Sequence, residues 1–175
     1  MSTAASSESL ITTTWPEGFD ARNPAIAGFA VREVAAPAES VFAWIRRPDL
    51  HTEYYKGLRG VRKAGGAWPQ LEVGSKVSFF LGALFVPPVK VVQCDPVGFH
   101  FAWAGGGPGI DAVHAFTVVA TSDTTSLLRS EEVWQGPVSK LIKPVAAGTL
   151  QKVQTDWAAA IAAAASQHPL GPPAA

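Results

Sequence analysis

The sequence predicts an α+β domain in which a curved seven-stranded antiparallel sheet wraps around one long C-terminal helix. Two observations predict this fold class. Between residues 58 and 134, apolar residues recur with period two and turn residues interrupt them at short intervals, which is typical of an antiparallel meander. After Gly136 the apolar residues recur at three- and four-residue steps, which is typical of a helix. A length of 175 residues suits one domain with one core.

One strand and two short helices are expected before the meander. The strand covers about residues 28–35, where apolar and polar residues alternate. Pro37 follows it, and proline is favoured at the first position of a helix. A second short helix is expected over about residues 48–56, so the early third of the domain holds the two short helices.

Six further strands are expected to follow one another through hairpins. Glycine, proline, serine and aspartate residues separate them. The strands cover about residues 58–63, 75–81, 89–94, 98–104, 110–120 and 125–134.

The last element is a helix over about residues 136–166. Its apolar positions are Leu141, Val145, Leu150, Val153, Trp157 and Ile161. Pro144 lies inside the helix and lacks a backbone donor, so a kink or a break into two pieces is predicted there.

The two ends of the chain are expected to lie outside the folded domain. Residues 1–27 form an N-terminal arm that is partly ordered, residues 28–166 form the domain, and residues 167–175 form a flexible tail. Trp15 and Phe19 are two aromatic residues in a polar arm, so the arm is expected to pack back on the domain.

The charge balance argues against several classes of partner. Lys and Arg together number 14, as do Asp and Glu, so no net field attracts nucleic acid or an anionic membrane. The alanine-rich stretch 158–165 is too short to cross a bilayer, so membrane insertion is not expected. The expected partner is a hydrophobic small molecule, and the protein itself is expected to be a monomer or a homodimer.

The cysteine content bears on the compartment. Cys94 is the single cysteine, so nothing indicates an oxidising environment, and a reducing cytoplasm is expected. Richness in Ala, Gly and Pro is typical of a bacterial source with high GC content.

Several short motifs occur in a recognisable order along the chain. They are Ala36-Pro37 before Val41-Phe42, the step 71–74, Asp95-Pro96 before Phe101-Ala102-Trp103, the stretch 114–118, and the stretch 132–136. With the order of the elements, they resemble the START-like (SRPBCC) superfamily of helix-grip proteins, and within it the polyketide cyclase/dehydrase and lipid-transport group. The resemblance covers about residues 28–166.

The resemblance implies a ligand cavity but no particular reaction. Members of the superfamily include lipid and hormone carriers, aromatic polyketide cyclases and activators of a heat-shock chaperone, all on one scaffold. A curved sheet with a helix across its open side leaves a tapering space between them. The glycine-rich stretch 105–109 is expected to form a mobile hairpin loop at the mouth of this space.

Aromatic residues on neighbouring expected strands are the candidates for lining the cavity. Either Phe79 or Phe80 faces it, and we choose Phe80. The expected ligand-binding residues are Tyr55, Phe80, Phe101, Trp103, Phe116, Trp134, Val145 and Val153. The alternative is that these side chains simply fill the core, as aromatic residues often do.

His114 and a glutamate are the candidates for chemistry. The turn at residues 122–123 brings His114 opposite Glu131 or Glu132, and one of these glutamates must face inward in a regular strand. In our hypothesis Glu132 orients the imidazole of His114, which acts as a general base on a polyketide-like ligand. The alternatives are a buried, hydrogen-bonded polar pair and a pair that orients the ligand.

No metal site and no organic cofactor are expected. The four histidines are scattered, and a cysteine-based cluster needs more than one cysteine. His51, near a short helix, is expected to be a solvated surface residue.

Three functions follow from these observations. The first is binding of a hydrophobic or aromatic small molecule, lipid-like or polyketide-like, between the sheet and the C-terminal helix. The second is a cofactor-independent polyketide cyclase or dehydratase that uses His114 and Glu132 as an acid-base pair. The third is a protein-interaction module of the chaperone-activator type, which should carry a large exposed apolar patch.

Overall fold

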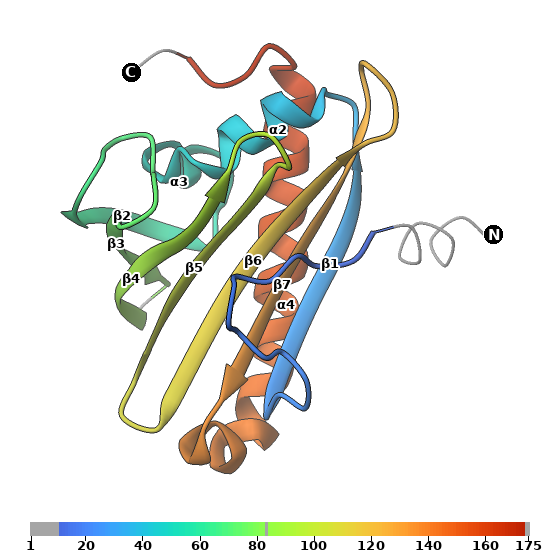
Figure 1. The fold of residues 1–175 in the computed structure, drawn as a ribbon. Coiled ribbons are helices and arrows are strands. Elements are labelled where there is room, and N and C mark those ends of the chain that lie inside the picture. Colours follow the sequence, from blue (N-terminus) through green and yellow to red (C-terminus); the bar gives the residue numbers. More distant parts are fainter. Residues whose placement is uncertain (1–10, 83, 174–175) are drawn as a thin grey trace.

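The computed structural model describes residues 11–82 and 84–173. Seven strands form one sheet, short helices follow the first strand, and a long helix follows the last (Figure 1). The strands are β1 (Ile26–Val34), β2 (Leu58–Gly65), β3 (Lys76–Leu81), β4 (Leu84–Asp95), β5 (His100–Gly107), β6 (Ile110–Ala120) and β7 (Ser126–Gln135). The helices are α2 (Ala38–Ile45), the 3₁₀ helix η2 (Pro48–Leu50), α3 (His51–Tyr54) and α4 (Pro137–Gln167).

The sheet is an antiparallel meander to which β1 is added. The strand order is β1-β7-β6-β5-β4-β3-β2, so β1 and β2 are the two open edges. Helix α4 lies across the concave face and packs mainly against β1 and β7 (Figure 1). Gly28 permits this approach, because a Cβ there would lie only 3.0 Å from the backbone nitrogen of Gln151. The predicted fold class, the helix-grip arrangement, is confirmed.

Strand β4 begins five residues earlier than predicted. Pro87 and Pro88 directly precede the predicted start at Val89, and proline cannot donate to a β ladder. A register shift between Val77 and Phe79 of β3 lies opposite these prolines. A bulge of this kind interrupts the ladder locally, so the two prolines are accommodated inside β4.

The predicted loop 105–109 is mostly strand. Residues Gly105 to Gly107 pair with Ile110 to Ala112, which leaves a two-residue turn at 108–109. The carbonyl oxygen of Gly109 accepts a hydrogen bond from the backbone nitrogen of Val138 at 3.1 Å. The turn therefore packs against the start of α4.

Helix α4 continues through Pro144, so the predicted break is absent. Proline removes the donor that would bond to the carbonyl of Lys140. Both residues are exposed, and water can satisfy that carbonyl.

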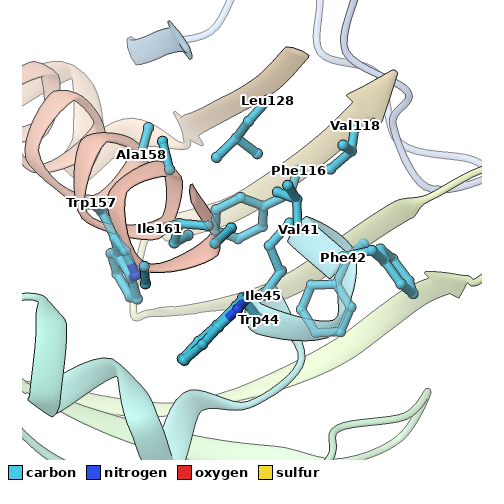
Figure 2. Close-up of a cluster of buried hydrophobic side chains, with 14 of the residues drawn as sticks. Val41, Phe42, Trp44, Ile45, Phe116, Val118, Leu128, Trp157, Ala158 and Ile161 are labelled. Atoms are coloured by element: carbon cyan, nitrogen blue, oxygen red, sulfur yellow. The ribbon is translucent and has the colours of Figure 1, made fainter. Parts of the chain in front are cut away.

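The main core lies between the concave face of the sheet, α2 and α4. Figure 2 shows Trp157, Ala158 and Ile161 of α4 beside Phe116 of β6, with side chains of α2 completing the cluster. Among the described residues, no helix is long and apolar enough to span a membrane.

The N-terminal arm covers the outer, convex face of the sheet (Figure 1). Trp15 and Phe19 pack against a small cluster on β5 and β6 that consists of Ala102, Val113 and Ala115. The backbone nitrogen of Thr14 donates to the hydroxyl of Thr117 at 3.1 Å. Residues 1–10 of the predicted arm lie outside the described residues.

Residues after α4 fold back on α2. The ring of His168 lies 5.9 Å from that of Trp44, and the Arg47 guanidinium donates to the carbonyl of Pro173 at 2.7 Å. Residues 174 and 175 of the predicted tail lie outside the described residues.

Candidate functional site

The β6–β7 ladder decides which glutamate faces inward. His114 pairs directly with Glu132, and both side chains lie on the concave side. Their closest atoms, His114 Nδ1 and Glu132 Oε2, are 3.6 Å apart. Glu131 points to the convex face, where it forms an ion pair with Arg129 at 2.8 Å.

A chain of hydrogen bonds connects the two side chains of this pair. His114 Nε2 lies 2.8 Å from the Ser130 hydroxyl, which donates to Gln154 Oε1 at 2.7 Å. Gln154 Nε2 then donates to Glu132 Oε2 at 2.8 Å, and Trp134 Nε1 donates to Glu132 Oε1 at 2.6 Å. We call His114, Ser130, Glu132, Trp134 and Gln154 the Glu132 cluster.

These hydrogen bonds fix which nitrogen of His114 carries the proton. The Ser130 hydroxyl gives its own proton to Gln154, so it accepts from His114 Nε2. The lone pair of a neutral His114 is therefore on Nδ1, facing Glu132. A lone pair and a carboxylate repel each other, so the arrangement is favourable when one proton lies between the two side chains.

Burial sets where this proton is held. Burial lowers the pKa of His114 to about 3, with a further lowering from nearby His51. Burial raises the pKa of Glu132 to about 7, against the opposing effect of the hydrogen bonds from Trp134 and Gln154. About 17% of the Glu132 side chain is exposed, and His114 is almost fully buried. Glu132 is therefore the group that changes protonation near neutral pH.

Aromatic side chains surround the Trp157 indole beside the Glu132 cluster. The Tyr55 ring stacks on it with a centroid distance of 5.4 Å, and the His114 ring meets it edge-on at 5.6 Å. Phe79 and Trp103 approach the same indole at 5.4 Å and 5.8 Å. Trp157 thus occupies the middle of the interior between sheet and helix.

Six of the eight expected ligand-binding residues lie at or beside this interior. Phe101, Trp103 and Phe116 are buried on neighbouring strands, with centroid distances of 5.5 Å from Trp103 to each of the other two rings. Tyr55 is buried against Trp157, and Val153 is partly buried against the same core. The sixth, Trp134, is half-buried and bonded to Glu132.

Phe80 lies apart from this interior. The structure places Phe79 inside, and Phe80 is 38% exposed on the outer face. Period two leaves open which of the two neighbours faces inward, and the burial of Val77 sets the phase: Phe79, two residues later on β3, faces the same side.

Val145 also lies apart from the interior, with 78% of its surface exposed. The step from Val145 to Leu150 is five residues, which turns the side chain about 140° around the helix. Leu150 is buried, so Val145 points away from the sheet.

His51 is fully buried, which contradicts its expected surface position. Its Nε2 lies 3.2 Å from the carbonyl oxygen of Trp44, and its ring contacts Tyr54 at 5.3 Å and Trp157 at 5.7 Å. The imidazole ring of His51 is packed in the core between α3 and α4. Burial lowers the pKa of His51 to about 4.

Buried polar atoms without a partner gather around His51. Among the described residues, the buried side-chain atoms without a hydrogen-bond partner include Trp44 Nε1, His51 Nδ1, Tyr54 Oη and Trp157 Nε1. We call these four residues the His51 cluster. Unpartnered buried polar groups are rare and mark places where a protein departs from pure packing.

Sequence reasoning missed Ser130, Gln154 and Trp157 as site residues. Gln154 had a signal, because it is a polar residue within the buried stripe of α4 between Leu150 and Ala158. Among the described residues, no group of three or more His, Cys, Asp or Glu is arranged to hold a metal ion.

Comparison with known proteins supports the fold. No protein-family model matches the sequence, and no curated protein matches it. A hypothetical protein from Helicobacter pylori has a TM-score of 0.72 and 16% identity over 88% of this chain and 96% of its own. An aromatase/cyclase from Streptomyces sp. R1128 has a TM-score of 0.63 and 10% identity, over 83% and 98%.

Norcoclaurine synthase from Thalictrum flavum, in complex with dopamine and hydroxybenzaldehyde, has a TM-score of 0.58 and 18% identity, over 90% and 98%. At these identities the similarity is one of fold. It agrees with the resemblance to helix-grip proteins that the sequence motifs indicated.

Proposed function

We propose that this helix-grip domain binds a hydrophobic or aromatic small molecule between the concave face of its sheet and α4. The observation that carries the proposal is the Glu132 cluster, a chain of hydrogen-bonded polar side chains set beside an aromatic interior. Pockets for small molecules combine an apolar lining with a few convergent polar groups in this way. Trp157, Trp103 and Tyr55 would contact the apolar part of the ligand, and Glu132 would contact its polar end.

Similarity of fold supports this class of ligand. One structural neighbour is an aromatase/cyclase, and another is a synthase solved with two aromatic molecules. The single cysteine is consistent with our proposal of a reducing, cytoplasmic compartment.

Access to the interior is proposed through the first half of α4. The interior rings contact one another, so a ligand must displace side chains. Within residues 137–149 Ser139 alone is buried, whereas Leu150 and Trp157 further along are buried. Segments with few buried contacts open at low free-energy cost, so this half of the helix would move first.

Native mass spectrometry of gently purified protein tests the binding proposal. We expect a co-purifying small molecule, and thermal stabilisation by 2-naphthol as a probe. Trp157→Leu should abolish the stabilisation, and the exposed control Leu141→Ala should preserve it. A clean apo mass with no stabilisation by lipids or aromatic probes would contradict the proposal and favour the protein-interaction module.

A second candidate is a cofactor-independent cyclase or dehydratase. The observation that favours it is the pKa of Glu132, which burial raises to about 7. A carboxyl with such a pKa can take a proton from an acidic C–H of a ligand and return it to a departing hydroxyl. His114, held neutral, would position Glu132, which reverses the roles predicted from the sequence.

The pH dependence of turnover tests this division of roles. Glu132→Gln should abolish turnover of a polyketide-like substrate and leave binding measurable. His114→Asn should shift the pH profile without abolishing turnover. Loss of turnover in His114→Asn with full activity in Glu132→Gln would restore His114 as the base.

A further inference from the structure

The hairpin between β3 and β4 exposes apolar side chains at one end of the sheet. Phe80 and Phe85 are directly opposite each other across the two strands, with ring centroids 5.2 Å apart. They are 38% and 49% exposed, and Leu84 beside the turn is 63% exposed. We call Phe80, Leu84 and Phe85 the apolar tip.

Basic residues are concentrated on the strands that carry this tip. The chain between Tyr55 and Asp95 contains one acidic residue, Glu72, whose carboxylate lies 4.0 Å from Arg46. The basic residues of the same stretch are Lys56, Arg59, Arg62, Lys63, Lys76 and Lys90. The neutral total charge of the protein therefore conceals a strongly basic edge.

Three of these basic residues share the outer face with Phe80 and Phe85, whereas Leu84 pairs with Leu81 and projects to the other side of the same end of the hairpin. Phe79 and Val77 point inward, so their neighbours in β3, Phe80 and Lys76, point outward. Lys90 pairs with Lys76, and Arg62 of β2 pairs with Ser78 next to Phe80. In Figure 1 these strands form the open edge of the sheet farthest from β1.

The pairing of Lys76 with Lys90 has a cost. Like charges directly opposite each other across two strands destabilise a sheet. Neither lysine forms an ion pair within the described residues. The pair is compensated if an anion outside the chain lies between the two ammonium groups.

We propose that the apolar tip and its basic face dock on the surface of an anionic lipid bilayer. The tip enters the headgroup region, and Arg62, Lys76 and Lys90 contact lipid phosphates. Basic residues beside exposed aliphatic and aromatic side chains are the recognised pattern of interfacial membrane binding. This docking does not depend on the proposed interior ligand.

Charge excludes the simplest alternative occupant. In a symmetric dimer the same patch meets itself, so each basic face would oppose another basic face. A nucleic acid would use the charges but would leave the aliphatic Leu84 without a role, since bases stack on planar rings.

Vesicle flotation of the full chain tests the proposal. The protein should float with phosphatidylcholine vesicles that contain phosphatidylglycerol, and not with phosphatidylcholine alone. Leu84→Asp with Phe85→Asp should weaken binding at least about tenfold, because burial of two such side chains is lost. The matched control is Val97→Asp with Leu170→Asp, two exposed residues away from the tip, and it should bind as the wild type does.

A second pair of variants separates local contact from total charge. Lys76→Glu with Lys90→Glu should reduce binding at least about tenfold, since each basic residue near the surface contributes about fivefold. Lys140→Glu with Lys152→Glu changes the total charge equally on α4 and should have little effect. Equal losses of vesicle binding in both double variants would overturn the proposal. So would a wild-type protein that does not bind anionic vesicles.

Two further outcomes identify other occupants. Self-association that the Leu84→Asp and Phe85→Asp changes abolish, without vesicle binding, would overturn the proposal in favour of a second copy. Binding to single-stranded DNA but not to vesicles would overturn it in favour of a nucleic acid. Circular dichroism melting of every variant establishes that it is folded.

Discussion

Two buried histidines contact the same tryptophan but differ in how well the polar atoms around them are hydrogen-bonded. His114 lies 5.6 Å from the Trp157 ring and belongs to the Glu132 cluster, in which each ring nitrogen faces a polar partner. His51 lies 5.7 Å from the same ring and belongs to the His51 cluster, in which four polar atoms lack partners. Burial is nearly equal, but the hydrogen bonding differs.

The secondary structure around each histidine explains the difference. His114, Ser130 and Glu132 lie on two paired strands, where the register places side chains opposite one another. Trp44, His51 and Tyr54 lie on short helices, which no ladder holds in register. Paired strands can set polar side chains opposite one another inside a core, where Gln154 of α4 joins them, whereas the short helices place Trp44, His51 and Tyr54 with polar atoms that lack partners.

The largest expected effect comes from removing Trp157, which belongs to the His51 cluster and contacts His114 of the Glu132 cluster. Trp157→Ala should lower the free energy of unfolding by about 3–5 kcal/mol, because a large buried aromatic side chain is lost. Urea denaturation measures it, and the exposed Leu141→Ala on the same helix should change stability by less than about 0.5 kcal/mol. A loss below about 1 kcal/mol for Trp157→Ala would mean that the two clusters are not joined through this ring.

Breaking the hydrogen bonds of the Glu132 cluster should lower the free energy of unfolding by nearly as much. Gln154→Ala removes the acceptor of the Ser130 hydroxyl and the donor to Glu132 Oε2, and we expect a loss of about 2–4 kcal/mol in urea denaturation. Gln151, one turn earlier on α4, bonds to the backbone of Phe29 but is exposed. Gln151→Ala should therefore lower the free energy of unfolding by about 1 kcal/mol or less. Equal losses for the two variants would show that the buried hydrogen bonds contribute no more to stability than the exposed ones.

The protonation of Glu132 should appear as a pH dependence of stability. Burial raises its folded-state pKa from 4.5 to about 7, so its contribution is fully present below pH 4.5 and is lost as the pH rises through 7. Since 17% of the side chain is exposed, we expect about 2 of the roughly 3 kcal/mol that this shift corresponds to.

Glu132→Gln removes this titration and keeps the size of the side chain. Relative to wild type, the variant should gain about 2 kcal/mol of stability between pH 4.5 and pH 7. His51 and His114 titrate in both proteins, so their effects should largely cancel in the difference. A difference that stays constant across this range would show that the carboxyl is not perturbed.

The smallest effects should have opposite signs in the two clusters. Ser130→Ala removes a partnered hydroxyl and should destabilise by about 1–2 kcal/mol. Tyr54→Phe removes a buried hydroxyl without a partner and should be neutral or stabilise by about 1 kcal/mol. Thermal unfolding of this matched pair tests the comparison directly, and destabilisation by Tyr54→Phe would show that its hydroxyl has a partner in solution.

The sequence predicted what strand alternation and element order control. His114 opposite an inward glutamate followed from two strands joined by a short turn, and the ladder pairs it with Glu132. The seven strands and the long helix followed from the change of period at Gly136. These features depend on neighbours in sequence or on regular pairing, which a pattern can express.

The remaining features depend on the phase of an element or on distant contacts, which a pattern alone does not give. The phase of β3, set by the buried Val77, decided between Phe79 and Phe80, and a five-residue step turned Val145 outward. His51 is followed by Thr52 and Glu53, a polar context that predicts the surface, but α4 passes over it and buries it. In each case the phase of an element or the contact with a distant element decided the outcome.

The N-terminal arm gives the convex face of the sheet an unusual property. Trp15 and Phe19 cover Ala102 and Ala115 on the convex side, and the main core covers the concave side. The middle strands are therefore buried on both faces. A shortened protein that lacked residues 11–25 would expose the apolar cluster of Ala102, Val113 and Ala115 to water, and two such molecules would associate through it. For crystallisation or fusion work, the arm is therefore part of the solubility of the molecule and should be retained.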